Sequence, residues 1–171
     1  MIRAIFLDVD GTLISFSTHE IPASARRALT QAHERGVRLF IATGRAANDL
    51  GPLEGIPYDG VVSLNGARCV ANDGRVVSLH PIPRADFERA LALSEEQDFA
   101  MGLELEEGVF VNRVTPDVKR VAHMVAHPVP EQTDLRELFG RVECCQLCFY
   151  FDAETQRRVM AELPTLVASR W

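Results

Sequence analysis

Short apolar runs alternate with amphipathic segments along the first half of the chain, and this pattern predicts alternating strands and helices. Residues 2–7, 37–42 and 60–64 are brief and apolar, and the first run is typical of a strand buried on both faces of a parallel sheet. Pro22 opens a predicted helix with apolar residues at helical spacing, and Gly36 follows it as a stop. Strand, helix, strand forms a βαβ unit, whose right-handed crossover places its strands in one parallel sheet.

Three local patterns complete this half of the chain. Residues 12–21 have no helical period and predict an extended flap. Residues 46–50 predict a short helix that the following Gly-Pro pair ends. Residues 68–70 and 75–79 flank Asn-Asp-Gly at 72–74, which is typical of a β-hairpin.

Two prolines, Pro81 and Pro83, separate this half from one of different style. The second half mixes hairpins and helices, which favours an α+β domain over 81–171 after a first domain over 1–80. Its predicted helices cover 84–97, the segment from Thr115 to about 125, 134–139 and the segment that Asp152 caps, and its predicted strands cover 100–105, 109–114, 142–151 and 166–168.

Composition narrows the function classes. The chain has 171 residues, 47% apolar and 25% charged, which is typical of a globular protein. Its net charge of −6 gives no electrostatic reason to bind nucleic acid. No apolar run approaches the roughly 20 residues that span a bilayer, and Asp8 and Asp10 interrupt the N-terminus where a secretory apolar segment would lie. We therefore expect a cytoplasmic protein without a membrane partner.

The cysteines predict no disulfide and no zinc site. Cys144, Cys145 and Cys148 fall in the predicted strand 142–151. At ~3.3 Å per residue, the first and last of them would lie about 13 Å apart on one face, too far for a disulfide. Zinc sites usually show two ligand pairs at defined spacing, so free buried thiols are the favoured interpretation.

The candidate chemistry lies where the first two strands end. Asp8 and Asp10 follow the first strand and Thr43 follows the second, at the edge where open α/β sheets bind ligands. A carboxylate can attack phosphorus and form an aspartyl-phosphate, a role that suits Asp8. A second acid two residues on, Asp10, can protonate the leaving group and then deprotonate the attacking water. Gly11 permits a tight turn that aims nearby amides, those of Val9 and Gly11, at phosphate oxygens.

Two carboxylates beside a phosphate call for a hard cation. Oxygen ligands select Mg²⁺, which Asp8 and Asp10 would bind. The hydroxyl of Thr43 and the amide of Gly44 are candidates to hold a phosphate oxygen. Arg45 either pairs with the phosphate or the substrate, or is simply solvated.

Less specific interpretations exist for each of these features. An Asp-x-Asp pair at a strand end is often structural or solvated, and Asn65 is either a turn former or a substrate contact at the sheet edge. An EF-hand loop is excluded, because its sixth and twelfth positions would be Leu13 and His19 rather than glycine and glutamate. His123 and His127 have zinc-ligand spacing but lack the metalloprotease glutamate, which favours surface histidines.

Two motifs resemble those of the haloacid dehalogenase superfamily. Residues 6–13, Phe-Leu-Asp-Val-Asp-Gly-Thr-Leu, resemble its first motif, and residues 41–45, Ile-Ala-Thr-Gly-Arg, resemble its second. The Ile-Pro helix entry at 21–22, the strand end at 63–67 and the layout of the second half are similar to the Cof-type branch. Members of that branch are mostly Mg²⁺-dependent phosphatases of sugar phosphates and other small metabolites, with a type IIB α/β cap after the third core strand.

The resemblance implies roles for single residues. Asp8 would be the nucleophile and a Mg²⁺ ligand, Asp10 the acid/base with a backbone metal contact, and Thr43 a phosphate binder. It also implies an α/β fold in which residues 1–80 form the N-terminal half of a Rossmann-like core and residues 81–171 form the inserted cap.

The chain departs from the family pattern after the cap. The third motif, a lysine, and the fourth, an acidic Gly-Asp cluster, lie on core strands that follow the cap, whereas this sequence stops at Trp171. Lys119 is the only lysine, and its place in a predicted cap helix does not suit the third motif. We therefore expect a chain truncated after the cap. The leading hypothesis is a Mg²⁺-dependent phosphatase of a small phosphorylated metabolite; the alternative is a non-catalytic remnant that acts as a binding module.

Overall fold

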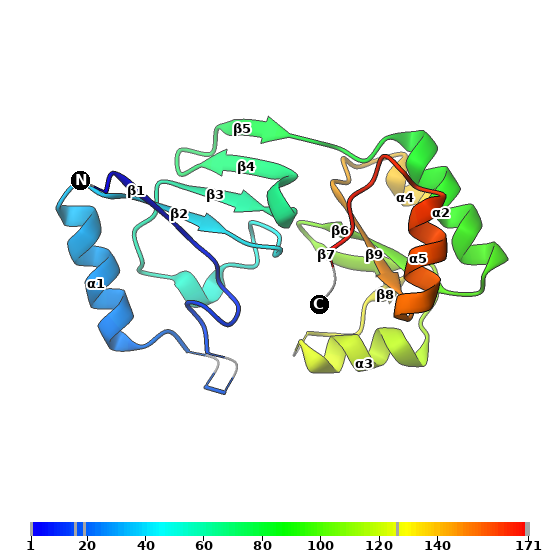
Figure 1. Ribbon diagram of the computed structural model, residues 1–171, viewed down its shortest axis with the longest axis horizontal. Coiled ribbons are helices and arrows are strands. Elements are labelled where there is room, and N and C mark those ends of the chain that lie inside the picture. The colour runs from blue at the N-terminus through cyan, green and yellow to red at the C-terminus, as the bar shows by residue number, and fades with distance from the viewer. Residues whose placement is uncertain (1, 16, 19, 126, 170–171) are drawn as a thin grey trace. The chain divides into compact units, whose positions relative to one another are not determined.

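The computed structural model describes residues 2–15, 17–18, 20–125 and 127–169. The chain divides into two compact units, Met1–His80 and Pro81–Trp171, each with a sheet of its own (Figure 1). Within the described residues, no helix is long and apolar enough to cross a membrane.

The first unit is a five-stranded mixed sheet with strand order β1-β2-β3-β4-β5. Strands β1 to β3 are parallel, and β3, β4 and β5 form an antiparallel meander. The α/β fold and the βαβ unit predicted from the sequence are confirmed. Its elements are β1 (Ala4–Leu7), α1 (Ala23–Glu34), β2 (Arg38–Ala42), β3 (Gly60–Ser63), β4 (Arg68–Ala71) and β5 (Val76–Leu79), with short 3₁₀ helices η1 (Gly51–Leu53) and η2 (Leu64–Gly66).

Helix α1 covers one face of this sheet. Its Leu29 is buried in a cluster with Leu39 and Ile41 of β2, both of which are fully buried, and with the partly buried Ile5 and Leu7 of β1. Apolar burial of this kind contributes about 25 cal/mol per Å², so the crossover is held mainly by the side chains that alternate toward α1.

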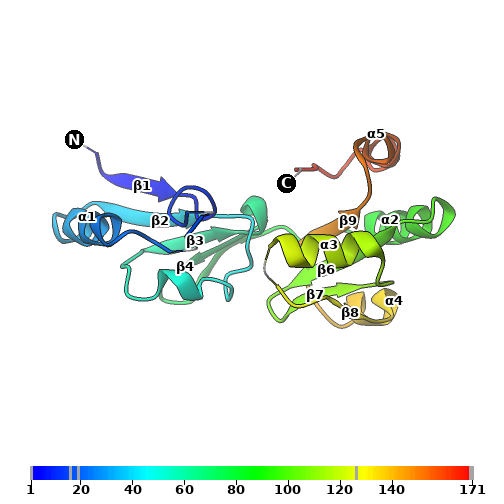
Figure 2. The ribbon, with the colours of Figure 1, turned by 90° about the horizontal axis from the view of Figure 1, so that it is seen from below.

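The prediction that β1 is buried on both faces is wrong. Figure 2 shows β1 at the margin of the sheet, and Phe6 is 63% exposed although it stacks on Phe40 at a centroid distance of 4.9 Å. Among the described residues β1 pairs with β2 alone. Because side chains alternate along a strand, Ile5 and Leu7 face the α1 side while Phe6 faces the other.

Two further local predictions are wrong. Residues 46–50 form no helix: the amide of Asp49 donates to the carbonyl of Ala46 in a single turn, and the helical hydrogen bonding starts only at Gly51, with Pro52 in the first turn of η1. Residues 166–168 form no strand: the chain turns from Leu163 to Leu166, and the described part of the chain offers this segment no strand partner.

The second unit is a four-stranded sheet with strand order β8-β7-β6-β9. Neither the two-residue strand β8 nor its parallel pairing with β7 was predicted, because two residues carry no periodicity. Its elements are α2 (Arg84–Glu96), β6 (Ala100–Leu105), β7 (Gly108–Val111), α3 (Pro116–Met124), β8 (Glu131–Gln132), α4 (Leu135–Phe139), β9 (Gln146–Tyr150) and α5 (Ala153–Ala161).

The two faces of this second sheet pack differently. Met101 and Leu103 of β6 point into the main cluster, where they meet Phe87 and Leu91 of α2 and Val159 of α5. The other face carries smaller residues under α3, which buries Val118, Ala100 and Val111 together. The alternation along β6 therefore sends Met101, Leu103 and Leu105 to the main cluster and Ala100 to the cluster under α3.

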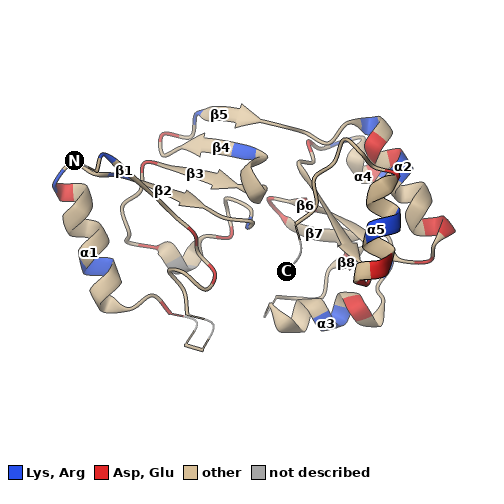
Figure 3. Cartoon of the chain, viewed as in Figure 1, with Lys and Arg blue, Asp and Glu red and all other residues tan. Residues whose placement is uncertain are grey.

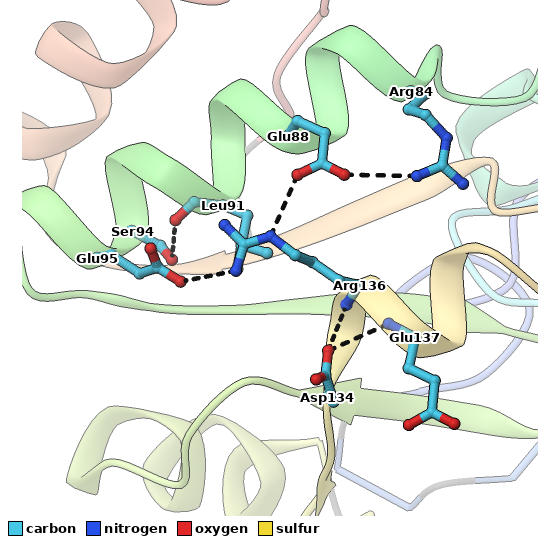
Figure 4. Close-up of polar contacts among 8 residues, drawn as sticks. All are labelled: Arg84, Glu88, Leu91, Ser94, Glu95, Asp134, Arg136 and Glu137. Carbon is cyan, nitrogen blue, oxygen red and sulfur yellow. Dashed lines mark hydrogen bonds and ion pairs between the residues drawn. The ribbon is translucent and has the colours of Figure 1, made fainter.

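Charged side chains tie α4 to α2 on the surface of this unit. Both signs lie close together on α2, α4 and α5 (Figure 3). Arg136 of α4 donates to Glu88 at 3.2 Å and to Glu95 at 3.4 Å, and Arg84 also reaches Glu88 (Figure 4). Beneath these ion pairs Phe87 and Phe139 stack at 4.0 Å. Exposed pairs contribute little individually, so the aromatic contact carries most of this packing.

Both predicted helix caps, Thr115 and Asp152, are present, and Asp134 caps a third helix. The side chains of Thr115, Asp134 and Asp152 accept hydrogen bonds from backbone amides in the first turns of α3, α4 and α5. The hydrogen bond from the Thr155 amide lowers the pKa of Asp152 below its usual 3.8.

All four cysteines are free thiols. The predicted strand is shorter than expected, so that Cys144 and Cys145 precede β9 and only Cys148 lies within it. The thiol of Cys144 donates to the Gln146 carbonyl at 3.1 Å, and burial raises its pKa to about 11. A thiol of this kind stays protonated and unreactive near neutral pH.

Replacing Gly60 by alanine is expected to destabilise the first unit. A Cβ there would lie 2.8 Å from the Val70 carbonyl oxygen of the neighbouring strand. Overpacking against backbone costs about 1–3 kcal/mol, which urea unfolding measures. The control is Gly51→Ala, where a Cβ meets nothing within 4 Å; equal destabilisation by both changes would contradict the close strand contact.

Asp152→Asn is expected to make the free energy of unfolding less dependent on pH in the acid range. A carboxyl whose folded pKa is depressed stabilises the fold above its unfolded pKa and loses that contribution as the pH falls through the folded value. Below about pH 3.8 the wild type should therefore lose stability faster than the variant, which keeps an uncharged cap. Urea unfolding followed by circular dichroism across this range measures both slopes, and parallel slopes would contradict the assignment.

Candidate active site

The first three strands bring polar residues to one edge of the first sheet. Because β1, β2 and β3 are parallel, Asp8, Thr43 and the Leu64-Asn65 turn all follow carboxyl ends on the same side. The amide of Asn65 donates to the Thr43 carbonyl at 3.2 Å and that of Leu64 donates to the Arg45 carbonyl at 3.1 Å, which joins the second and third strand ends.

The loop after β1 is a tight turn built on Val9. Val9 is 1% exposed, and its carbonyl accepts from the amides of Leu13 and Ile14 at 3.0 and 2.8 Å. Gly11 has a φ of 77°, a conformation that glycine adopts readily. Its amide donates to the Ile14 carbonyl at 2.8 Å. The expectation that the Gly11 amide points at a phosphate is therefore corrected: Gly11 supplies the turn, and its N–H is used within it.

Asp8 presents an exposed carboxylate at the end of β1. Its Oδ2 accepts a hydrogen bond from the Thr12 hydroxyl at 2.9 Å. Its Oδ1 has no hydrogen-bond partner among the residues that the structure describes. One oxygen of this exposed carboxylate is thus held, and the other has no partner among the described residues, which leaves it available to act as a nucleophile.

Asp10 forms a two-pronged ion pair with Arg45 from the second strand end. Arg45 Nε donates to Asp10 Oδ2 and Nη2 donates to Asp10 Oδ1, both at 2.8 Å. The side chains are 20% and 23% exposed, so solvent screens the pair only in part. The hydrogen bond to Asp10, with the nearby charges, raises the pKa of Arg45.

The far side of the Arg45 guanidinium is held by Asp49. Nη1 donates to the Asp49 carboxylate and to its backbone carbonyl, both at 3.2 Å. The sequence left Arg45 either as a partner of the phosphate or the substrate, or as a solvated side chain. In the structure Arg45 is the centre of an Asp10–Arg45–Asp49 ion-pair triad.

Thr43 is 6% exposed and its hydroxyl oxygen accepts from the Arg45 amide at 3.2 Å. Since this bond uses an oxygen lone pair, the hydroxyl proton remains available to donate. Asn65 has a φ of 54°, a left-handed conformation that asparagine tolerates better than most residues. Gly44 lies between Thr43 and Arg45 in the bend that follows β2.

An open hollow of about 390 Å³ lies over the loop that follows Asp10. The hydroxyls of Ser15 and Ser17 in its lining are 2.8 Å apart. The residues around it are Gly11, Thr12, Leu13, Ser15, Ser17 and Pro22. The hollow places hydroxyl groups next to the turn that carries both acids.

The donors at this edge fit a hard divalent cation only in part. Within the described residues, no group of three or more His, Cys, Asp or Glu is placed to hold a metal, and this holds for His123 and for the described thiols as well. Mg²⁺ is often bound by one or two carboxylates, with waters and substrate phosphate oxygens as its other ligands. Asp8 Oδ1 and the backbone carbonyl of Asp10 would supply such a minimal set, since Arg45 bonds both carboxylate oxygens of Asp10.

Comparison with known proteins identifies the family of the chain. The model of the haloacid dehalogenase-like hydrolases matches residues 5–171. The chain belongs to this family. It is also similar to a putative phosphatase, YkrA, from Bacillus subtilis, at 25% identity over 99% of this chain and 65% of that protein.

Two solved phosphatase structures of the same superfamily match closely. BT1666 from Bacteroides thetaiotaomicron shares 53% identity at a TM-score of 0.95, with 100% of this chain and 64% of that one covered. The subclass IIB sugar phosphatase BT4131 shares 29% identity at a TM-score of 0.84, with 99% and 66% covered. The chain thus spans about two thirds of the length of its relatives.

Two site residues were missed by reasoning from the sequence. Thr12 holds Asp8, and its only signal was its place beside the two acids. Asp49 holds Arg45. The i, i+4 spacing of Arg45 and Asp49 was visible in the sequence, but beside a predicted helix over 46–50 it indicated only an ordinary surface ion pair. Hydrogen bonds bring Asp10, Thr43, Arg45 and Asn65 together in the structure, while their chemical roles stay predictions.

Proposed function

We propose that this protein is a phosphatase that hydrolyses small phosphorylated metabolites, in particular sugar phosphates, through an aspartyl-phosphate on Asp8. The observation that carries the proposal is the exposed Asp8 carboxylate at the carboxyl end of β1, with one oxygen held by Thr12 and the other without a hydrogen-bond partner among the described residues. The phosphatases YkrA, BT1666 and BT4131 support the reaction class, and the name of BT4131 supports the substrate class.

The reaction would proceed in two displacements. In the first, an Asp8 oxygen bonds to phosphorus, the bond from phosphorus to the leaving oxygen breaks, and Asp10 gives that oxygen a proton. In the second, Asp10 takes a proton from water as the water oxygen bonds to phosphorus and the bond to Asp8 breaks. Phosphate leaves, and both acids return to their starting forms. The pairing of Asp10 with Arg45 corresponds to its carboxylate form, which the second displacement uses.

The phosphate would be held by groups at the second and first strand ends. The Thr43 hydroxyl is buried and keeps its proton for donation, and the amides of Gly44 and Val9 are the backbone donors we assign beside it. Asp8 and Asp10 would hold Mg²⁺, which when bound neutralises phosphate charge. Asn65, from the third strand end, is assigned to substrate contact.

The two units would serve as core and cap. We assign residues 1–80 to the N-terminal half of the catalytic core and residues 81–171 to a type IIB-like cap that shapes substrate choice. We expect the binding partner to be a small phosphorylated metabolite, and neither a nucleic acid nor a membrane.

Asp8→Asn is expected to lower turnover of a panel of sugar phosphates by roughly ten-thousandfold, because an amide cannot attack phosphorus. Phosphate release measures turnover, and unchanged circular dichroism shows that the fold is kept. Asp117→Asn is the control, since it removes a carboxylate from an exposed arginine pair in α3. Undiminished turnover in the Asp8 variant would rule out the mechanism.

Chelation of divalent cations is expected to stop turnover, and added Mg²⁺ should restore it. Without the cation, the negative charges of the Asp8 carboxylate and the phosphate dianion repel each other directly. Phosphate release with EDTA, and then with excess Mg²⁺, measures the effect. Activity that survives the chelator unchanged would contradict the metal assignment.

A non-catalytic binding module is the alternative, and one observation favours it. Lys119, the only lysine, lies in α3 of the second unit, so the described part of the first unit offers no lysine to balance phosphate charge. If no substrate in the panel is hydrolysed while a phosphorylated compound still binds, the hypothesis of a binding module is correct. The intact mass of the purified protein shows which polypeptide the assay contains.

A further inference from the structure

Arg45 has little capacity left for a ligand. A guanidinium has five N–H groups. Arg45 donates two hydrogen bonds to the Asp10 carboxylate and two to Asp49, which together occupy four of them. Its side chain is 20% exposed. With four of its five N–H groups bonded to Asp10 and Asp49, the Arg45 guanidinium is suited to hold these residues in place rather than to bind a phosphate.

The geometry fixes the Asp10 carboxylate in one plane. Nε and Nη2 each bond a different oxygen of Asp10 at 2.8 Å, and a side-on pair of this kind sets the rotation of the carboxylate. Asp49 bonds the opposite corner of the guanidinium, through Nη1. It thereby prevents Arg45 from turning toward another anion at the sheet edge.

The backbone supports the same arrangement. The Arg45 amide donates to Thr43 Oγ1 and the Arg45 carbonyl accepts from Leu64, so its main chain is fixed on both sides. The amide of Asp49 donates to the Ala46 carbonyl, which holds the turn that brings the Asp49 carboxylate back to Arg45. Residues 43–49 therefore form a small hydrogen-bonded segment that holds the Arg45 guanidinium against the Asp10 carboxylate.

We propose that Asp49 is a positioning residue for the reaction, which acts through Arg45 to orient the Asp10 carboxylate. The proposal rests on the acid/base role of Asp10 in the proposed function. In this proposal Arg45 binds and orients Asp10 instead of binding the substrate. Asp49 then affects the rate of turnover without touching the phosphate.

Turnover of the 171-residue chain distinguishes positioning from substrate binding. Asp49→Asn should lower kcat by roughly tenfold with KM changed less than about twofold, as for other residues that orient a catalytic group. Arg45→Lys should lower kcat as well, because lysine keeps the charge but cannot form the side-on pair. If Arg45 bound the phosphate, Arg45→Lys would raise KM and Asp49→Asn, which frees the cation, would lower it.

Asp117→Asn is the matched control for the loss of one arginine-paired carboxylate. Asp117 accepts from Arg120 at 3.0 Å on the exposed side of α3, outside the first unit. It should leave kcat and KM unchanged. A fall in kcat in this control equal to that in Asp49→Asn would overturn the proposal.

A second readout does not depend on activity. In ¹⁵N NMR spectra, the Nε–H of Arg45 should be protected from exchange with water by its bond to Asp10. Asp49→Asn should abolish that protection, while Asp117→Asn should preserve it. If no substrate is turned over by the wild type, the phosphatase proposal fails and this measurement alone decides whether Asp49 orders the Arg45–Asp10 pair. Full protection in Asp49→Asn would overturn the inference.

Discussion

The parallel pairing of β1 with β2 is the constraint on which the rest of the first unit depends. It aligns Leu7 with Ile41, so that the residues after both strands leave the sheet at the same edge and level. The Asp10–Arg45 pair, which joins residues 35 positions apart, follows from that alignment. A slip by one residue would turn Leu7 and Ile5 away from α1, and the apolar cluster on that face opposes it.

Much of this arrangement can be predicted from sequence because it depends on periodicity and local turn chemistry. The apolar runs locate β2 and β3, the Asn-Asp-Gly turn locates the β4–β5 hairpin, and cap residues locate α3 and α5. The two acids at a strand end were identified for the same reason. Their position depends on strand direction, which the crossover determines.

The rest depends on contacts that a local pattern does not contain. Whether β1 is central or marginal depends on which strands lie on each side of it, and so the exposure of Phe6 could not be predicted from the apolar run. The partners of Arg45 depend on the path of residues 46–50, which turn rather than coil into a helix. The use of the Gly11 amide likewise depends on a return of the chain to Ile14.

The strand order also has a kinetic consequence. Short turns connect β3, β4 and β5, whereas the connection from β1 to β2 includes the segment 12–21 and the helix α1. Closing the longer loop costs more chain entropy, so we expect the meander to form first and β1 to join it late. The strand that Asp8 follows would then be the last to join the sheet, and Asp8 and Asp10 would reach their positions beside Thr43 and Arg45 only when that sheet is complete.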